Sequence, residues 1–333
     1  MDLTLSADQR ALRSGLRDVL AELWSAERLR EAAASVAPSR TAPSSKDWRS
    51  LAELGVFGVT VPEADDGMGL GLADAAVLFE ELGAALVPGP LVPTVLAAGT
   101  VAGAVDGDAV VTMLDLRAPV LLVEHLDVAT HVVAVDDEGL YLLPSDALGA
   151  TPVETPLDPL TPLWVVPAGR DVPGLGERIG SAGDAAGWMR SGAVLNSAMQ
   201  VGVARGGLDL AVRYALERVQ FGRVIGGFQA VKHLLAESLV RVELARAAVL
   251  VAALTIDDPE VGGVEEAVAA AKVLADEAAT LGGRSCVQVH GGMGFSWEVL
   301  AHLYLKRAWV LETCFGSADD HAALLARISF GHE

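Results

Sequence analysis

Cysteine is nearly absent from this sequence, whose 333 residues contain only Cys286 and Cys314. Two cysteines cannot build the disulfide network that stabilises small secreted proteins, and there is no CxxC motif of the kind that holds a metal. The length is sufficient for two or more domains with a large core. We therefore expect a globular protein of the reducing cytoplasm, without a metal site.

Basic residues are also scarce. Lys and Arg together number 24, against 44 Asp and Glu, so the net charge is −20, and only four of the basic residues are lysines. A nucleic-acid-binding surface needs a clustered cationic stripe, and docking on anionic lipid needs basic side chains as well. We therefore expect neither nucleic acid nor a membrane surface among the partners.

The sequence lacks a long unbroken apolar run. Its most apolar stretch, residues 86–105, is interrupted by Pro88, Pro90 and Pro93. A membrane-spanning helix needs about 20 consecutive apolar residues and does not easily accommodate that proline spacing. The N-terminus shows no basic segment followed by an apolar run, so we expect no signal peptide.

What is present is a change of hydrophobic period along the chain. Residues 1–104 carry apolar residues at helical spacing, residues 105–180 carry short β-branched runs, and residues 181–333 return to long helical stripes. These three regions are the expected domains. The last, with several long helices in series, is typical of a four-helix bundle.

Local signals refine this division. Ser6 and Gln9 fit a capping box at the start of the first helix. The Pro/Ser-rich residues 35–46 predict a loop, and residues 73–86 predict a helix with Glu80 and Glu81 on its exposed side. The β-branched runs 131–135 and 140–143 flank a predicted hairpin turn.

Two motifs point to chemistry. The first is RVQFG at residues 218–222, followed by GGFQ at residues 226–229. Arg218 offers a planar cation for a phosphate or carboxylate, and Gln229 offers amide donors at a predicted helix start. Such a start suits a diphosphate. Alone, each of these side chains is also typical of a solvated helix end.

The second motif is QVHGGMGF at residues 288–295, between two predicted helices. Its glycines let the backbone approach a ligand closely and present N–H groups. It is not a GxGxxG motif after a strand, so it does not indicate a Rossmann phosphate site. Taken by itself, it also fits a plain connection between helices.

Three stretches together resemble the acyl-CoA dehydrogenase family, in the same order and over nearly the whole chain. They are residues 51–83 (LG…VPEADDGMGLG…EELG), residues 218–233 (RVQFGRVIGGFQAVKH) and residues 288–308 (QVHGGMGF…LYLKRA). The resemblance implies a mainly α fold with a small β-domain. Its parts would be an N-terminal helical domain at 1–104, a reduced middle β-domain at 105–180 and a C-terminal four-helix bundle at 181–333.

The same resemblance implies FAD as cofactor, an acyl-CoA thioester as substrate, electron-transfer flavoprotein as acceptor and assembly through the C-terminal helices. In such enzymes these two motifs contact the diphosphate and adenine side of a neighbouring subunit's FAD. By position, the residues implied in this role are Arg218, Phe221, Gln229, Gln288, Gly291 and Gly292.

The catalytic base of the family is missing. The resemblance places its usual glutamate at Phe315, before Gly316, and the alternative position used by some relatives near Gly192. Neither residue can accept a proton. Glu312, about one helical turn before Phe315, is a weak candidate for a relocated base, and an exposed helix carboxylate is the more economical interpretation.

The middle region is also shorter than the family pattern, with only 75 residues from Asp106 to Gly180. The segments that would cover the flavin ring of the same subunit are not recognisable there. We therefore expect this chain to be half of a shared site, in an α2β2 assembly with a full-length acyl-CoA dehydrogenase subunit. The resemblance suggests the heteromeric enzymes of steroid side-chain degradation in actinobacteria, with one FAD per heterodimer.

Two alternatives stay open. One is a self-sufficient homo-oligomeric dehydrogenase with a relocated base such as Glu312. The other is a non-catalytic binding or structural protein that keeps only the fold.

Overall fold

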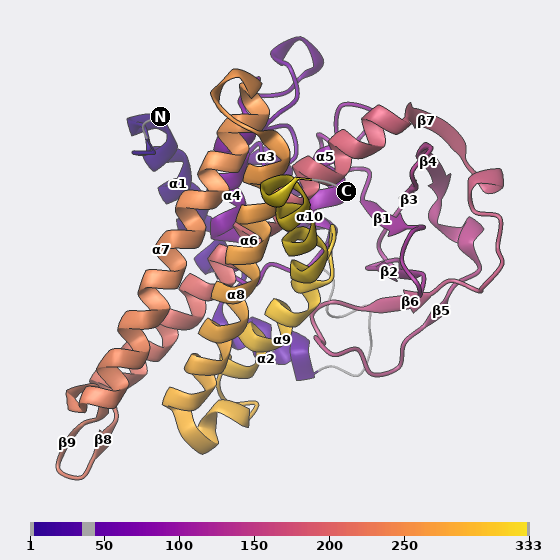
Figure 1. Cartoon of the computed structure of the whole chain (residues 1–333). Coiled ribbons are helices and arrows are strands. Elements are labelled where there is room, and N and C mark those ends of the chain that lie inside the picture. Colours follow the sequence, from indigo (N-terminus) through magenta and orange to yellow (C-terminus); the bar gives the residue numbers. More distant parts are fainter. Residues whose placement is uncertain (1–2, 35–43, 332–333) are drawn as a thin grey trace. The chain divides into compact units, whose positions relative to one another are not determined.

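The computed structural model describes residues 3–34 and 44–331, which form two compact units (Figure 1). Unit 1 consists of Met1–Glu31, Leu72–Val87 and Ala193–Glu333, and unit 2 consists of Ala32–Gly71 and Pro88–Gly192. Most of the predicted loop at residues 35–46 lies outside the described residues.

Unit 1 is helical. Its N-terminal part contains α1 (Ala7–Leu23), most of α2 (Ala26–Ala34) and α4 (Leu72–Ala84). Its C-terminal part contains most of α6 (Ala182–Glu217), then α7 (Gln229–Asp257), α8 (Val264–His290), α9 (Ala301–Glu312) and α10 (Ala318–Phe330). The predicted capping box is present, since Ser6 Oγ accepts from the Gln9 N–H and the Gln9 side chain accepts from the Ser6 N–H.

The long helices α6, α7 and α8 run in alternating directions, each connected to the next at one end of the bundle (Figure 1). Between α6 and α7 the chain forms a small hairpin of β8 (Val219–Gln220) and β9 (Arg223–Val224), followed by a 3₁₀ turn, η5 (Ile225–Gly227). Figure 1 shows this hairpin projecting beyond the end of the bundle. The helix α6 ends at Glu217, because the residues that follow pair as strands.

Unit 2 holds α3 (Ser45–Glu53), α5 (Leu91–Ala97) and two small sheets. The four-stranded sheet has the order β1-β3-β4-β7 and the three-stranded sheet the order β2-β6-β5. The strands are β1 (Val111–Asp115), β2 (Leu122–Glu124), β3 (His131–Val135), β4 (Gly139–Pro144), β5 (Thr151–Pro152), β6 (Leu163–Val165) and β7 (Glu177–Ser181). β1 pairs with β3 in parallel and β3 with β4 antiparallel, so the predicted hairpin is confirmed.

The hairpin turn forms for a local reason. Asp136 Oδ1 accepts hydrogen bonds from the N–H groups of Glu138 and Gly139, which closes the turn with a side chain. The unit's core is mainly aliphatic and includes Leu114, Val132 and Leu148. Among the described residues, no helix is both long enough and apolar enough to cross a membrane.

Candidate functional site

Each of the six residues implied in flavin contact lies at the same end of the unit 1 bundle. They occupy the end of α6, the β8–β9 hairpin, the start of α7, the end of α8 and the following 3₁₀ segment η7 (Gly291–Phe295) (Figure 1). All six are exposed: Arg218, Phe221, Gln229, Gln288, Gly291 and Gly292. The structure therefore brings together the two motifs, which are about 60 residues apart, on one accessible surface.

Phe221 is the most unusual residue of this set. Its side chain is 92% exposed, and its φ of +51° is left-handed, as is the φ of +78° at Gly222. Positive φ at both central residues of a two-residue hairpin is the geometry that favours Asn-Gly or Asp-Gly, and it is costly for phenylalanine. An unfavourable backbone under an almost fully exposed aromatic ring is the kind of local strain that clusters at functional sites.

The start of α7 offers an anion site next to the hairpin. The N-cap residue Phe228 makes no side-chain capping hydrogen bond, so the first backbone N–H groups of α7 remain available to a ligand. The positive end of the helix dipole favours a negative group there. Arg218 is exposed and has no ion-pair partner among the described residues, so its guanidinium can also receive such a group.

The end of α8 presents backbone rather than side chains. Gly291 has a φ of +59°, and a Cβ built at Gly291 or Gly292 would meet no atom within 4 Å. The absence of side chains here leaves open space through which a ligand can reach the backbone. Gln288, in the last turn of α8, is exposed beside this opening.

The surface is held in place by a buried core behind it. The Tyr214 ring stacks on His290, with centroids 4.3 Å apart, and His290 Nδ1 lies 2.8 Å from the Cys286 carbonyl oxygen. Burial raises the pKa of the Cys286 thiol to about 12, so this cysteine is a packing residue and not a nucleophile.

These features fit part of FAD. The Arg218 guanidinium and the uncapped start of α7 suit the diphosphate, and the exposed Phe221 ring suits the adenine. The two open glycines suit a close approach of the ligand to the backbone. Among the described residues, no group of three His, Cys, Asp or Glu side chains is placed to hold a metal ion.

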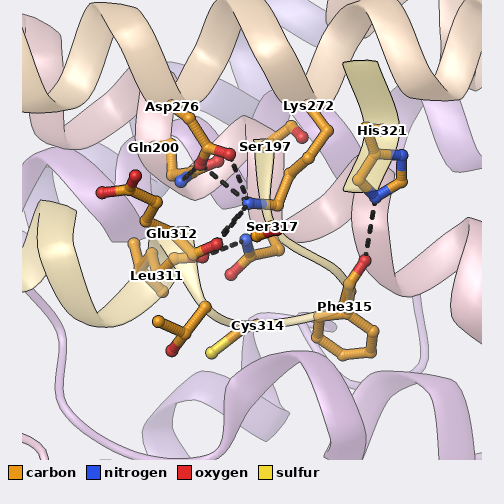
Figure 2. A network of polar contacts seen from close by, with 12 residues as sticks. Ser197, Gln200, Lys272, Asp276, Leu311, Glu312, Cys314, Phe315, Ser317 and His321 are labelled. Carbon is orange, nitrogen blue, oxygen red and sulfur yellow. Dashed lines mark hydrogen bonds and ion pairs between the residues drawn. The ribbon is translucent and has the colours of Figure 1, made fainter. Parts of the chain in front are cut away.

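The position that the resemblance implies for the family's catalytic base lies in a turn between α9 and α10. Phe315 is buried and has a φ of +59°, and Gly316 follows with a φ of +90°. His321 Nε2 lies 3.0 Å from the Phe315 carbonyl oxygen and fixes the turn from α10 (Figure 2). Gly192, which the resemblance implies as the alternative base position, lies within α6 and offers no side chain.

A buried charge network supports the same turn (Figure 2). Lys272 is fully buried, and its Nζ lies 2.7 Å from both carboxylate oxygens of Asp276. Nζ also lies 3.1 Å from the carbonyl oxygen of Glu312, so the ammonium caps the end of α9. Gln200 donates its amide to Asp276. Spacing alone would have suggested an exposed i,i+4 pair.

Glu312, the weak candidate for a relocated base, points away from Phe315 in Figure 2. Its Oε2 lies 3.5 Å from the Thr280 hydroxyl on α8, and its side chain is half-buried. The structure therefore places this carboxylate beside α8 and not on the Phe315 side of the turn.

The expectation that Glu80 and Glu81 are exposed is wrong. They are only 6% and 3% exposed, and they pair with arginines from three other helices of unit 1. Arg246 binds Glu80 through two nitrogens, and Arg17 does the same with Glu81. Arg205 contacts both glutamates.

This cluster explains the pKa of Glu81. Burial raises it, but the hydrogen bonds from Arg17 and the charge of Arg205 outweigh burial and hold the pKa below its usual range. Because α4 is buried along almost its whole length, the helical period could not show which face was exposed.

Comparison with known proteins identifies the family. Residues 6–105 match the model described as "Acyl-CoA dehydrogenase, N-terminal domain", and residues 184–330 match "Acyl-CoA dehydrogenase, C-terminal domain". The chain belongs to the acyl-CoA dehydrogenase family, whose members are oxidoreductases that use FAD. The predicted resemblance and fold class are thereby confirmed, while the domain borders at 104 and 180 stay a prediction.

Named relatives refine this picture. Acyl-CoA dehydrogenase IpdE2 of Mycolicibacterium smegmatis is 35% identical over 303 residues, covering 88% of this chain and 91% of that protein. Acyl-CoA dehydrogenase FadE34 of Mycobacterium tuberculosis is 35% identical in an alignment of 294 positions that covers 78% of this chain and 39% of that protein.

Solved structures show the same fold. The Tcur3481–Tcur3483 steroid ACAD aligns with a TM-score of 0.81 at 25% identity and covers 98% of both chains. A chain of the ChsE4–ChsE5 complex from Mycobacterium tuberculosis aligns with a TM-score of 0.81 at 22% identity, over the full length of both chains.

Proposed function

We propose that this chain is one subunit of a heteromeric FAD-dependent acyl-CoA dehydrogenase, active as an α2β2 complex in the cytoplasm. The reaction is the α,β-desaturation of an acyl-CoA thioester of the steroid side-chain type. A full-length partner subunit supplies the catalytic glutamate and the pocket for the flavin ring. This chain supplies the contacts to the diphosphate and adenine side of the partner's FAD.

The observation that carries this proposal is a contrast within unit 1. The six residues of the flavin-contact surface are present and exposed, whereas both base positions hold residues that cannot take a proton, Phe315 and Gly192. A chain that kept only the fold would not need a left-handed exposed phenylalanine at a hairpin tip.

The need for a partner is supported by apolar side chains left in solvent. On α6 and α7, Leu216, Leu239, Val240 and Leu244 are at least half exposed, close in sequence to Phe221 or on the helix that follows it. The η7 segment adds Phe295. Soluble chains seldom leave so many large apolar residues exposed unless another surface covers them.

The substrate class is supported by the solved relative described as a steroid ACAD, to which this chain is 25% identical. That relative and the ChsE4–ChsE5 complex are both named with two components, which supports a two-subunit enzyme. FadE34 also supports a second component, since the region that matches this chain is only 39% of that longer protein.

The mechanism divides between the subunits. When bound, FAD supplies the acceptor for the hydride that leaves the β-carbon of the thioester. Arg218 and the start of α7 would hold the diphosphate, and Phe221 would stack on the adenine. The open backbone at Gly291 and Gly292 lets the cofactor approach α8. Electron-transfer flavoprotein is the proposed acceptor of the electrons.

Co-expression with a full-length acyl-CoA dehydrogenase from the same genome tests the assembly. We expect the two chains to co-elute in equal amounts at the mass of a heterotetramer, measured by size-exclusion chromatography with light scattering. Elution of this chain by itself as a homo-oligomer, with the full-length protein in a separate peak, would contradict the proposal.

A further inference from the structure

The exposed Phe221 ring rests on a second aromatic residue. Its centroid lies 6.1 Å from that of Phe228, and the two ring planes stand at 88°, the edge-to-face geometry that aromatic pairs favour. The tip of the hairpin is therefore not held by backbone pairing alone, which extends over only two residues of each strand.

The Phe228 ring is itself held from another side. The Arg223 guanidinium carbon lies 4.1 Å from the Phe228 ring centroid, within the range of a cation–π contact. Arg223 pairs with Gln220 across the hairpin, so the same residue belongs to β9 and covers the ring at the start of α7.

The backbone of Phe228 is fixed by the adjacent helix. Its N–H donates to the Ile225 carbonyl oxygen over 3.0 Å, and its carbonyl oxygen accepts from the Lys232 N–H over 3.1 Å. Phe228 is thus anchored in the first turn of α7, and the chain of contacts runs from α7 through Phe228 to Phe221. Arg223, in strand β9 of the hairpin, contacts the Phe228 ring from the other side.

We propose that Phe228, clamped by Arg223, is a positioning residue that sets the Phe221 ring for stacking against the partner's FAD. The inference rests on the proposed function, in which Phe221 touches the cofactor and Phe228 does not. Phe221 bears an unfavourable φ and is open to solvent, so without this support its ring would have no fixed orientation. A preset ring costs less ordering when the ligand arrives.

A double-mutant cycle separates positioning from general stabilisation. The dissociation constant of FAD is measured by flavin fluorescence in the complex with the full-length partner, for the wild type, Phe221→Ala, Phe228→Leu and the double variant. We expect Phe228→Leu to weaken FAD binding about three- to tenfold when Phe221 is present, and less than twofold when it is absent. Phe228→Tyr, which keeps the ring, should restore wild-type affinity.

The matched control is Phe330→Ala on α10, since Phe330 is 87% exposed and lies outside the flavin-contact surface. It should leave FAD binding unchanged. An equal loss from Phe228→Leu in both backgrounds, or no loss in either, would overturn the positioning role. If Phe221→Ala leaves FAD binding unchanged, Phe221 does not contact the cofactor and the proposed function fails as well. If Phe221→Ala weakens FAD binding and Phe228→Leu does not, only the positioning role fails.

A readout on the isolated chain complements the cycle. With 4-fluorophenylalanine incorporated at position 221, the fluorine resonance should carry a ring-current shift from Phe228 that Phe228→Leu removes and Phe228→Tyr retains. A resonance that is identical in all three proteins would show that the two rings do not meet, and would overturn the proposal.

Discussion

At the residue scale, two nearly fully exposed phenylalanines can be compared. Phe330 ends α10 with no aromatic partner described, whereas Phe221 adopts a left-handed backbone and rests on Phe228. Exposure alone does not indicate function. The combination of exposure, an unfavourable φ and a specific support is what separates Phe221 from an ordinary surface residue.

Arg218 gives the simplest residue-scale prediction. Arg218→Ala removes the cation that we assign to the FAD diphosphate, so the dissociation constant of FAD from the complex should rise at least about tenfold, or about 1.4 kcal/mol. Flavin release can be followed by fluorescence. Arg327→Ala, an exposed arginine on α10, is the control and should have no effect. Equal behaviour of the two variants would count against the assigned contact.

Glu312 carries the alternative with a relocated base. Because its carboxylate points away from Phe315, we expect Glu312→Gln to retain full turnover of an acyl-CoA in the complex, measured by reduction of an electron acceptor. A loss of several hundredfold, with the chain still folded, would instead make Glu312 the base.

At the residue scale, the sequence predicted the two motifs but did not predict which charged side chains are buried. The motifs in 218–229 and 288–295 could be recognised because glycine suits close backbone approach and Arg and Gln suit polar contacts with a ligand. Glu80 and Glu81 were misplaced because their partners come from α1, α6 and α7, far away in sequence. The sequence around a glutamate on an apolar helix does not indicate which distant arginines will pair with it.

At the scale of elements, close packing of α4 against α6 depends on glycine. A Cβ at Gly202 would lie well inside contact distance of the Glu80 carbonyl oxygen, and one at Gly83 would clash with the Met199 carbonyl oxygen. The backbones of these helices therefore approach more closely than side chains allow. This close approach brings Arg205 of α6 to the two glutamates of α4.

Gly202→Ala should therefore destabilise the fold by about 2–3 kcal/mol, since the clash is with backbone that cannot rotate away. Gly187→Ala, on the same helix with no atom within 4 Å of the added carbon, should be neutral or stabilise by about 0.5–1 kcal/mol. Urea unfolding followed by circular dichroism checks both. A Gly202→Ala protein as stable as the wild type would show that α4 and α6 are not in close contact.

The Lys272–Asp276 pair predicts a pH effect on α8. Burial outweighs the attraction of Lys272 and raises the pKa of Asp276 from 3.8 to about 6. The folded state then binds this proton more tightly than the unfolded chain does. The resulting stabilisation is fully present below about pH 4 and is lost as the pH rises through 6.

The wild type should therefore lose about 2 kcal/mol of unfolding free energy between pH 4 and 6.5 that Asp276→Asn does not lose. The measurement is a series of urea titrations of both proteins across that range. Glu81, whose pKa is lowered, gives an opposite trend, but it is common to both proteins and cancels in the difference. Parallel pH profiles would contradict the assignment.

At the scale of the whole molecule, the order of helices and strands could be predicted because periods of 3.6 and 2 alternate cleanly along the chain. The β8–β9 hairpin could not, since two-residue strands leave no period to detect. The hydrophobic period of a helix also does not show which apolar residues a partner subunit would cover. The exposed apolar residues of α6 and α7 became visible as unpartnered only when the helices were placed in three dimensions.

The central claim is that this chain holds half of a shared flavin site, and flavin content tests it most directly. The FAD bound per chain, and the turnover of an acyl-CoA thioester, are measured for the isolated chain and for its complex with the full-length partner. We predict no stoichiometric FAD and no turnover for the isolated chain, and one FAD per heterodimer with turnover in the complex. One FAD per chain with acyl-CoA oxidation by the isolated protein would contradict the account.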